Sequence, residues 1–194
     1  MMNKQSNMRK VIAAINMTLD GVCDHTVGIV DEKLHHHYSD LVNNAGVMLY
    51  GRTTYELMQF WQTLLTNPSD QKSMNDFAFS INKIKKIVFS DSLKNTGWDT
   101  AKIADRPLEE IVLDLKQQSG KNILIGSRSL IIQLLNSNLI DEFQICIHPI
   151  IEGKGLPLFD HIKEQIILKL LNSKILESGV TIFYYQPTKK TTNR

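Results

Sequence analysis

Cysteine is scarce in this sequence, with two residues, Cys23 and Cys146, in a chain of 194. They stand far apart and outside any Cys-x-x-Cys pair, which excludes a disulfide framework or a structural zinc site of closely spaced cysteines. We interpret both as structural thiols in a reducing compartment, the cytoplasm. The polar residues 1–8 lack the apolar run of a secretory signal, and we interpret them as a tail.

Long apolar runs and a strong charge of one sign are also missing. No stretch approaches the roughly 20 apolar residues that a membrane-spanning helix needs. The 22 Lys and Arg residues oppose 20 Asp and Glu residues, for a formal net charge of +2. This near neutrality excludes the basic surface typical of proteins that bind nucleic acid or membranes. We therefore expect no nucleic-acid or membrane partner, and any binding site must be local.

What is present is an alternation of apolar runs of strand length with segments of helical period. Strands are expected over residues 9–16, 47–50, 86–89, 122–125 and 143–148, and helices over residues 31–44, 52–65, 74–81, 108–118 and 130–135. This order is typical of a mostly parallel sheet with helices on its faces.

The end of the chain departs from that alternation. Residues 166–176 and 180–185 form two strand patterns joined across a Ser-Gly turn, which predicts an antiparallel hairpin. We assign residues 9–187 to one α/β domain and residues 188–194 to a second polar tail.

Three predicted strands end at small residues that open a helix or a loop: Gly51, Ser90 and Gly126. In open α/β sheets, ligands bind at the carboxyl ends of the strands, where free backbone N–H groups attract phosphate. Arg52 and Arg128 follow two of these turns and offer bidentate donors to phosphate oxygens. The dinucleotide fingerprint G-x-G-x-x-G and the P-loop are both absent, so each turn taken singly is also explained as a structural corner.

Several motifs together resemble the dihydrofolate reductase superfamily. The motifs are residues 17–21 (MTLDG), 50–56 (YGRTTYE), 122–127 (NILIGS), 139–159 and 178–180 (SGV). More narrowly, they resemble the reductase domain of bifunctional riboflavin-biosynthesis proteins and its stand-alone bacterial relatives. The resemblance implies a three-layer α/β/α dihydrofolate reductase-like fold, with a central mostly parallel sheet and an antiparallel C-terminal hairpin. It also implies a homodimer, with the late strands as a candidate interface.

The resemblance further implies a nicotinamide dinucleotide across the strand ends. We choose NADPH and leave NADH open, because Asp91 beside Ser90 is unfavourable for a 2′-phosphate. The family usually has a Gly-Gly pair where this chain has Gly126 and Ser127. Gly51 is one implied cofactor contact. The others are Arg52 and Thr53 near the adenosine-side phosphates, Thr54 and Gly126, Ser127, Arg128 and Ser129 at the pyrophosphate, and Ser90 at the adenosine ribose.

The proton donor is less well defined by sequence. Dihydrofolate reductases carry a substrate-binding carboxylate on their first helix, but Asp31, Glu32 and Asp40 give no unique match here. We name Asp20, in the loop over the nicotinamide, as the candidate catalytic acid, and a turn-forming Asp-Gly pair is the alternative.

Aromatic and histidine side chains offer candidate substrate contacts. The run His35-His36-His37 does not converge on one metal ion, because consecutive helical residues point about 100° apart, so we expect no metal site. His37 lies on the helix that borders the substrate pocket in the resembling family and is our candidate substrate contact. Phe60, Trp61 and Phe77 are candidates to line a pocket for a flat heterocycle, with a place in the core as the alternative.

These features lead to an NADPH-dependent reductase that transfers a hydride to a small planar heterocycle, pterin-like or pyrimidine-like. Two alternatives remain open: a non-catalytic nucleotide-binding protein, and a pyrimidinone reductase of the riboflavin pathway. The second is weakened because the zinc motifs of the accompanying deaminase are absent from this sequence.

Overall fold

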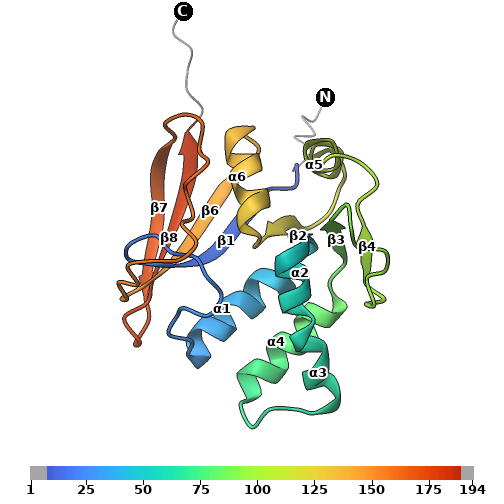
Figure 1. The fold of residues 1–194 in the computed structure, drawn as a ribbon, viewed down its shortest axis with the longest axis horizontal. Helices are drawn as coiled ribbons and strands as arrows, with labels where there is room; N and C mark the ends of the chain where they lie inside the picture. Colours follow the sequence, from blue (N-terminus) through green and yellow to red (C-terminus); the bar gives the residue numbers. More distant parts are fainter. Residues whose placement is uncertain (1–7, 189–194) are drawn as a thin grey trace, which may run out of the picture.

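The computed structural model describes residues 8–188, so the predicted tails lie almost entirely outside the described part (Figure 1). Its strands are β1 (Val11–Thr18), β2 (Ala45–Gly51), β3 (Lys86–Phe89), β4 (Ala101–Ile103), β5 (Asn122–Ile125), β6 (Glu142–His148), β7 (Ile167–Ile175) and β8 (Thr181–Thr188). Its helices are α1 (Glu32–Asn43), α2 (Arg52–Met58), α3 (Phe60–Thr66), α4 (Lys72–Lys83), α5 (Leu108–Gln117) and α6 (Arg128–Asn136).

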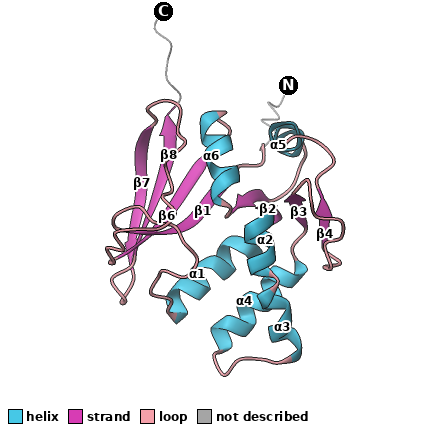
Figure 2. Ribbon diagram, in the orientation of Figure 1, coloured by secondary structure: helices cyan, strands magenta, loops and turns pink. Residues whose placement is uncertain are grey.

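The strands form one sheet with the order β4-β3-β2-β5-β1-β6-β8-β7. The pairs from β4 to β6 are parallel, and β8 pairs antiparallel with both β6 and β7. Figure 2 shows the two C-terminal strands side by side at one edge of the sheet. The predicted fold, a mostly parallel sheet with an antiparallel C-terminal hairpin, is confirmed.

Alternate side chains of the central strands feed two separate cores. On one face Val11, Ala13 and Ile15 of β1 pack with the apolar sides of α5 and α6. On the other face Ile12 and Ala14 pack with α1, α2 and α4. Because strand side chains alternate with a period of two, a continuous apolar run such as residues 11–15 buries both faces, and the result is three layers.

Two expectations about single elements were wrong. The helix expected over residues 52–65 is divided at Gln59, where the Gln62 N–H donates to the Gln59 carbonyl (3.0 Å), a tighter turn than the α-helical one. The strand β4 was missed, because its three residues carry no apolar run and lie at the sheet edge. Within residues 8–188, none of the helices combines the length and the apolarity that a membrane crossing requires.

Candidate active site

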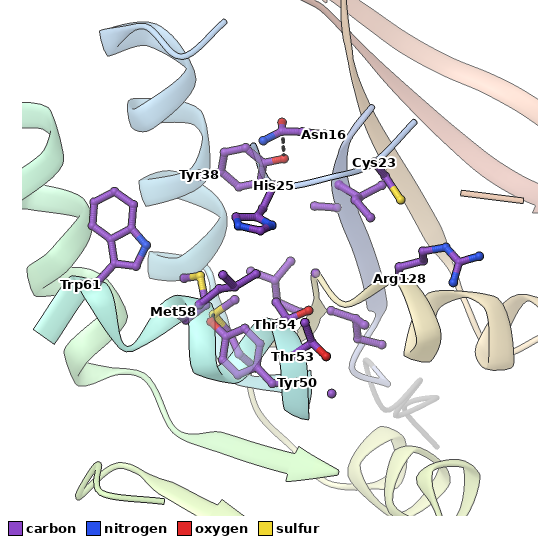
Figure 3. Close-up of a pocket in the computed structure, with 18 of the residues that line it drawn as sticks. Asn16, Cys23, His25, Tyr38, Tyr50, Thr53, Thr54, Met58, Trp61 and Arg128 are labelled. Atoms are coloured by element: carbon purple, nitrogen blue, oxygen red, sulfur yellow. Dashed lines mark hydrogen bonds between the residues drawn. The ribbon is translucent and has the colours of Figure 1, made fainter. Parts of the chain in front are cut away.

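A cavity of about 870 Å³ opens at the carboxyl ends of β1, β2 and β5, the three strands at the centre of the sheet. Helices α1 to α4 supply one wall, and the loop between β1 and α1 (residues 19–31, here the cover loop) lies over it. Figure 3 shows Arg128, Thr53 and Thr54 toward one end of this cavity and Trp61, Met58 and Tyr38 toward the other. Carboxyl strand ends are where open α/β sheets bind ligands, so this cavity is the candidate site.

The two predicted phosphate turns lie beside each other in the structure. The backbone N–H of Gly51 donates to Ser127 Oγ (2.9 Å), and a Cβ on Gly51 would lie 3.1 Å from Ser129 Oγ. Gly51, Gly126 and Ser129 line the cavity, whereas Ser127 is buried and outside the lining. The hydroxyl of Ser127 therefore joins the two turns, and it does not cap the N-terminus of α6.

Arg52 contacts the turn that follows β3, the turn in which Ser90 lies, but it does so through Ser92. The Arg52 guanidinium donates to Glu56 Oε1 (2.7 Å) and to Ser92 Oγ (2.6 Å). Ser90 Oγ accepts from the backbone N–H of Leu93 (3.1 Å), which closes the turn after β3. Ser90 itself is not among the lining residues, so the side chain that reaches from α2 to this turn is Arg52.

Arg128 lines the cavity but already has partners. Its Nε donates to the Pro157 carbonyl (2.7 Å), and its guanidinium forms an ion pair with Asp160. Both partners belong to the loop between β6 and β7 (residues 149–166, here the β6–β7 loop). The predicted phosphate ligand therefore also clamps this loop onto the start of α6.

Asp20 tethers the same loop from the other side. Its carboxylate accepts from Thr18 Oγ1 (2.6 Å) and from the backbone N–H groups of Glu152 (3.2 Å) and Gly153 (2.7 Å). These hydrogen bonds, with that from Thr18 the largest contribution, lower the pKa of Asp20 to about 2. A carboxyl group with that pKa has no proton to give at neutral pH, and Asp20 is outside the cavity lining. The geometry gives Asp20 a structural task.

The face that α1 turns toward the cavity carries Leu34, His35, Tyr38 and Val42. His37, our candidate substrate contact, is outside the lining and packs edge-on against Tyr38 (ring centroids 5.4 Å apart) and Tyr184 (6.2 Å). The reason is the helical period, which turns the side chain two positions after His35 to another side. The acidic residues Asp31, Glu32 and Asp40 are likewise outside the lining, and Asp31 caps α1 by accepting from the Leu34 N–H (2.7 Å).

The cavity lining also holds polar residues that were not predicted, among them Tyr38, Asn16, Asp24 and His25. Tyr38 Oη donates to Asn16 Oδ1 (2.9 Å), and the His25 ring projects from the cover loop into the cavity with its Nδ1 3.3 Å from Asp24 Oδ1 (Figure 3). Asn16 carried the clearest signal, as a polar residue at the end of an otherwise apolar strand. His25 carried none, because it lies in a loop without a motif.

The aromatic residues that were candidates for either the pocket or the core take part in both, since Phe77 is buried in a core cluster and Trp61 packs against that cluster. Phe60, Trp61 and Phe77 all line the cavity, with the Trp61 and Phe77 ring centroids 4.6 Å apart.

The two cysteines lie in different surroundings. Cys23 lines the cavity and donates to the Leu156 carbonyl (3.4 Å). Cys146 is fully buried, and its burial raises the pKa of the thiol to about 12. Among residues 8–188, no group of three or more His, Cys, Asp or Glu side chains is placed to hold a metal ion.

The chain is similar to known proteins over nearly its whole length. A family model described as the RibD C-terminal domain matches residues 9–182. YyaP, an uncharacterized protein of Bacillus subtilis strain 168, is 33% identical over 188 residues, which cover 95% of this chain and 98% of YyaP.

Solved structures show the same fold at low sequence identity. A pyrimidine reductase-like protein from Corynebacterium diphtheriae superimposes with a TM-score of 0.66 at 14% identity, covering 93% of this chain and 92% of that one. The dihydrofolate reductase of Enterococcus faecalis, complexed with NADP(H), gives 0.62 at 12% identity, covering 93% and 97%. The dihydrofolate reductase-like fold predicted from the motifs is thus confirmed.

Proposed function

Because the chain belongs to the RibD C-terminal domain family, we propose that it is an NADPH-dependent reductase that transfers a hydride to a small planar heterocycle. One observation carries the proposal. The turns at Gly51 and Gly126, joined through Ser127, open into the same cavity as an aromatic wall. A single cavity therefore offers one end for a dinucleotide phosphate and another for a flat ring.

The residues at the turn end fit a dinucleotide. Gly51 lies so close to Ser129 Oγ that a side chain there would crowd the approach of a ligand to the backbone. The start of α6 has no side-chain cap, which leaves its first N–H groups available to an anion. We assign Gly51, Thr53, Thr54, Gly126, Arg128 and Ser129 to the phosphates, and Arg52 with the turn after Ser90 to the adenosine end.

The bound dinucleotide supplies the hydride, and this chain's residues position both reactants and exclude water. The cover loop is held over the cavity by backbone pairing with the β6–β7 loop, in which the Cys23 N–H donates to the Leu156 carbonyl and the Leu158 N–H to the Gly21 carbonyl (both 2.9 Å). His25 on this loop offers an imidazole to the substrate end, and Asp24 orients it.

We also propose that the protein works as a homodimer in the cytoplasm. Both cysteines are free thiols, as a reducing compartment maintains them. The edge strand β7 exposes several apolar side chains, among them Ile167 and Ile175, which suits a second copy of the chain.

Titration with NADPH and with NADH tests the dinucleotide assignment. We expect NADPH to bind more tightly, and Arg52→Ala to weaken NADPH roughly ten-fold while changing NADH little, as expected for loss of one charged hydrogen bond to a 2′-phosphate. The matched control is Arg106→Ala, which removes an exposed arginine paired with Asp114 outside the cavity and should change neither affinity.

The outcomes distinguish the placement of Arg52, the binding of a dinucleotide and the reductase activity. Equal weakening of NADPH and NADH in Arg52→Ala would move Arg52 away from the 2′-phosphate. Failure of the unaltered protein to bind either dinucleotide would refute the proposal. Tight NADPH binding without cofactor oxidation across a panel of heterocycles would favour a non-catalytic nucleotide-binding protein.

A further inference from the structure

The end of the cavity away from the phosphate turns is an aromatic wall built from three helices. His35 comes from α1, Phe60 and Trp61 from α3, and Phe77 from α4. The Trp61 ring meets Phe77 edge to face at 80°, and His35 meets Trp61 at 85° with centroids 6.0 Å apart. Rings that fix one another in this way form a preorganised apolar surface for a flat ligand.

This aromatic end has no lysine or arginine to receive an anionic substituent. Among the lining residues of the described chain there is no lysine, and the two arginines, Arg52 and Arg128, stand at the turn end with Glu56 and Asp160 as their partners. Burial lowers the pKa of His35, which keeps that imidazole neutral at neutral pH. Asp24 and His25 of the cover loop line the cavity as a pair, with 3.3 Å between Asp24 Oδ1 and His25 Nδ1, so each has the other as its partner. A phosphate would therefore lose its hydration without gaining a counter-charge.

The same end has no carboxylate on α1 to pair with a cationic aminopyrimidine edge. The α1 side chains at the cavity are apolar or neutral, and the acidic residues of that helix lie outside the lining. The polar groups at this position are instead Tyr38 and Asn16, which are hydrogen-bonded to each other. No described residue accepts a hydrogen bond from the Asn16 Nδ2 amide. A primary amide of this kind donates to a carbonyl oxygen or a ring nitrogen.

We propose that the substrate is a neutral planar ring with a carbonyl or imine edge, bearing neither a phosphate nor a cationic aminopyrimidine edge. This inference rests on the proposed function and deepens it. The aromatic wall takes the ring face, and the Asn16 amide takes the carbonyl or imine edge. Reduction then saturates one C=N or conjugated C=C bond. The hydride adds to carbon, a proton adds to the nitrogen or the α-carbon, and NADPH is oxidised to NADP⁺.

Matched ligand pairs test this class by calorimetric titration, with and without saturating NADP⁺. Lumazine, a neutral pteridinedione, is compared with 2,4-diaminopteridine, and uridine with uridine 5′-phosphate. We expect the first member of each pair to bind at least about ten-fold more tightly, since the second carries a charge or edge without a partner. We expect Trp61→Ala to weaken lumazine, whereas Phe79→Ala, an exposed aromatic on α4 outside the lining, should not.

The second test replaces the amide nitrogen of Asn16 by an oxygen and so examines the role of this side chain. Asn16→Asp should invert the pteridine preference toward 2,4-diaminopteridine, because a carboxylate then faces the ring edge. Asn172→Asp, on the exposed strand β7, is the control and should leave both affinities unchanged. An unaltered preference in Asn16→Asp would overturn the role of Asn16.

The remaining outcomes keep the two proposals apart. Tighter binding of uridine 5′-phosphate or of 2,4-diaminopteridine to the unaltered protein would overturn the substrate class and leave the dinucleotide assignment intact. Binding of NADPH with no binding of any of the four probes would likewise overturn the substrate class and leave the dinucleotide assignment intact. Failure of NADPH to bind, with lumazine still preferred, would refute the reductase and support the neutral-ring site.

Discussion

Three consecutive histidines on α1 occupy three different environments. His35 packs against Trp61 and Phe77 at the cavity, His36 is exposed beside Glu32, and His37 is buried against Tyr38 and Tyr184. Burial, with a smaller contribution from the charge of Lys174 and against the opposing charge of Asp40, lowers the pKa of His37 to about 4. The same residue type thus has one exposed and two shielded copies within a single turn.

The lowered pKa makes His37 a source of acid sensitivity. An unfolded histidine has a pKa of about 6.5. Between about pH 6.5 and 4, His37 is therefore protonated in the unfolded chain and neutral in the folded chain. This contribution to stability is complete above pH 6.5 and is lost as the pH falls toward 4, by about 3 kcal/mol at most.

We therefore expect His37→Leu to flatten the acid limb of the stability curve, as measured by urea unfolding at a series of pH values. His36→Leu, the matched change on the exposed neighbour, should keep the slope of the unaltered protein. The other shielded histidines, His35 and His148, also have lowered pKa values, and they remain in both variants. Parallel curves for His37→Leu and the unaltered protein would show that His37 is not the titrating group.

At the scale of elements, two loops close on one another beside the cavity. The cover loop and the β6–β7 loop pair through backbone hydrogen bonds. Gly155 of the β6–β7 loop packs so closely on the cover loop that a Cβ at this position would lie 2.7 Å from Val22 Cγ1. Gly155 also has φ +130°, a conformation that side chains disfavour. Arg128 at the start of α6 then holds the β6–β7 loop through Pro157 and Asp160.

Arg128 has two competing uses, because a guanidinium paired with Asp160 is less available to a phosphate. We expect Asp160→Ala to tighten NADPH binding roughly three-fold, the scale of a partly exposed ion pair. Fluorescence titration measures this, with Asp105→Ala as the control, since Asp105 lies near Arg106 on the surface and outside the cavity. Weaker NADPH binding in Asp160→Ala would instead mean that the ion pair positions Arg128 for the cofactor.

At the scale of the whole molecule, the sheet of residues 8–188 ends in a strand that exposes apolar side chains. On β7, Ile167 is 61% exposed and Ile175 is 76% exposed, and Leu170 and Leu171 between them are also exposed. An edge strand of nine residues with free backbone groups and apolar side chains pairs readily with another chain. The opposite edge, β4, has three residues and is far less suited to pairing.

We expect the homodimer to form through β7. The double variant Leu171→Lys, Ile175→Lys should shift the mass measured by light scattering after size exclusion from two chains to one. Leu113→Lys, at an exposed leucine on α5, is the control and should leave the dimer intact. A monomeric unaltered protein, or a dimer that survives the double variant, would exclude this interface.

Local sequence was sufficient for the order of the elements. The apolar runs at β1, β2 and β5, the glycines at the ends of β2 and β5, and the Ser-Gly turn before β8 each act over a few residues, so a period or a turn residue indicates them. It failed where an element was short, as at β4, or where a turn tightened within one helical pattern, as at Gln59. It also predicted the strand ends as the place for a ligand, and the cavity opens there, because topology and chain direction follow from the alternation of elements.

Tertiary packing alone decided what the side chains at those strand ends do. Ser127 accepts from Gly51, Arg128 pairs with Asp160, and Tyr38 donates to Asn16. These partners lie far apart in the chain or on different elements, so no local period encodes their meeting. The direction of His37, away from the cavity, likewise depends on how α1 is rotated against the sheet. Rotation and long-range pairing are set by the packing of two complete cores, and they exist only once the whole domain has folded.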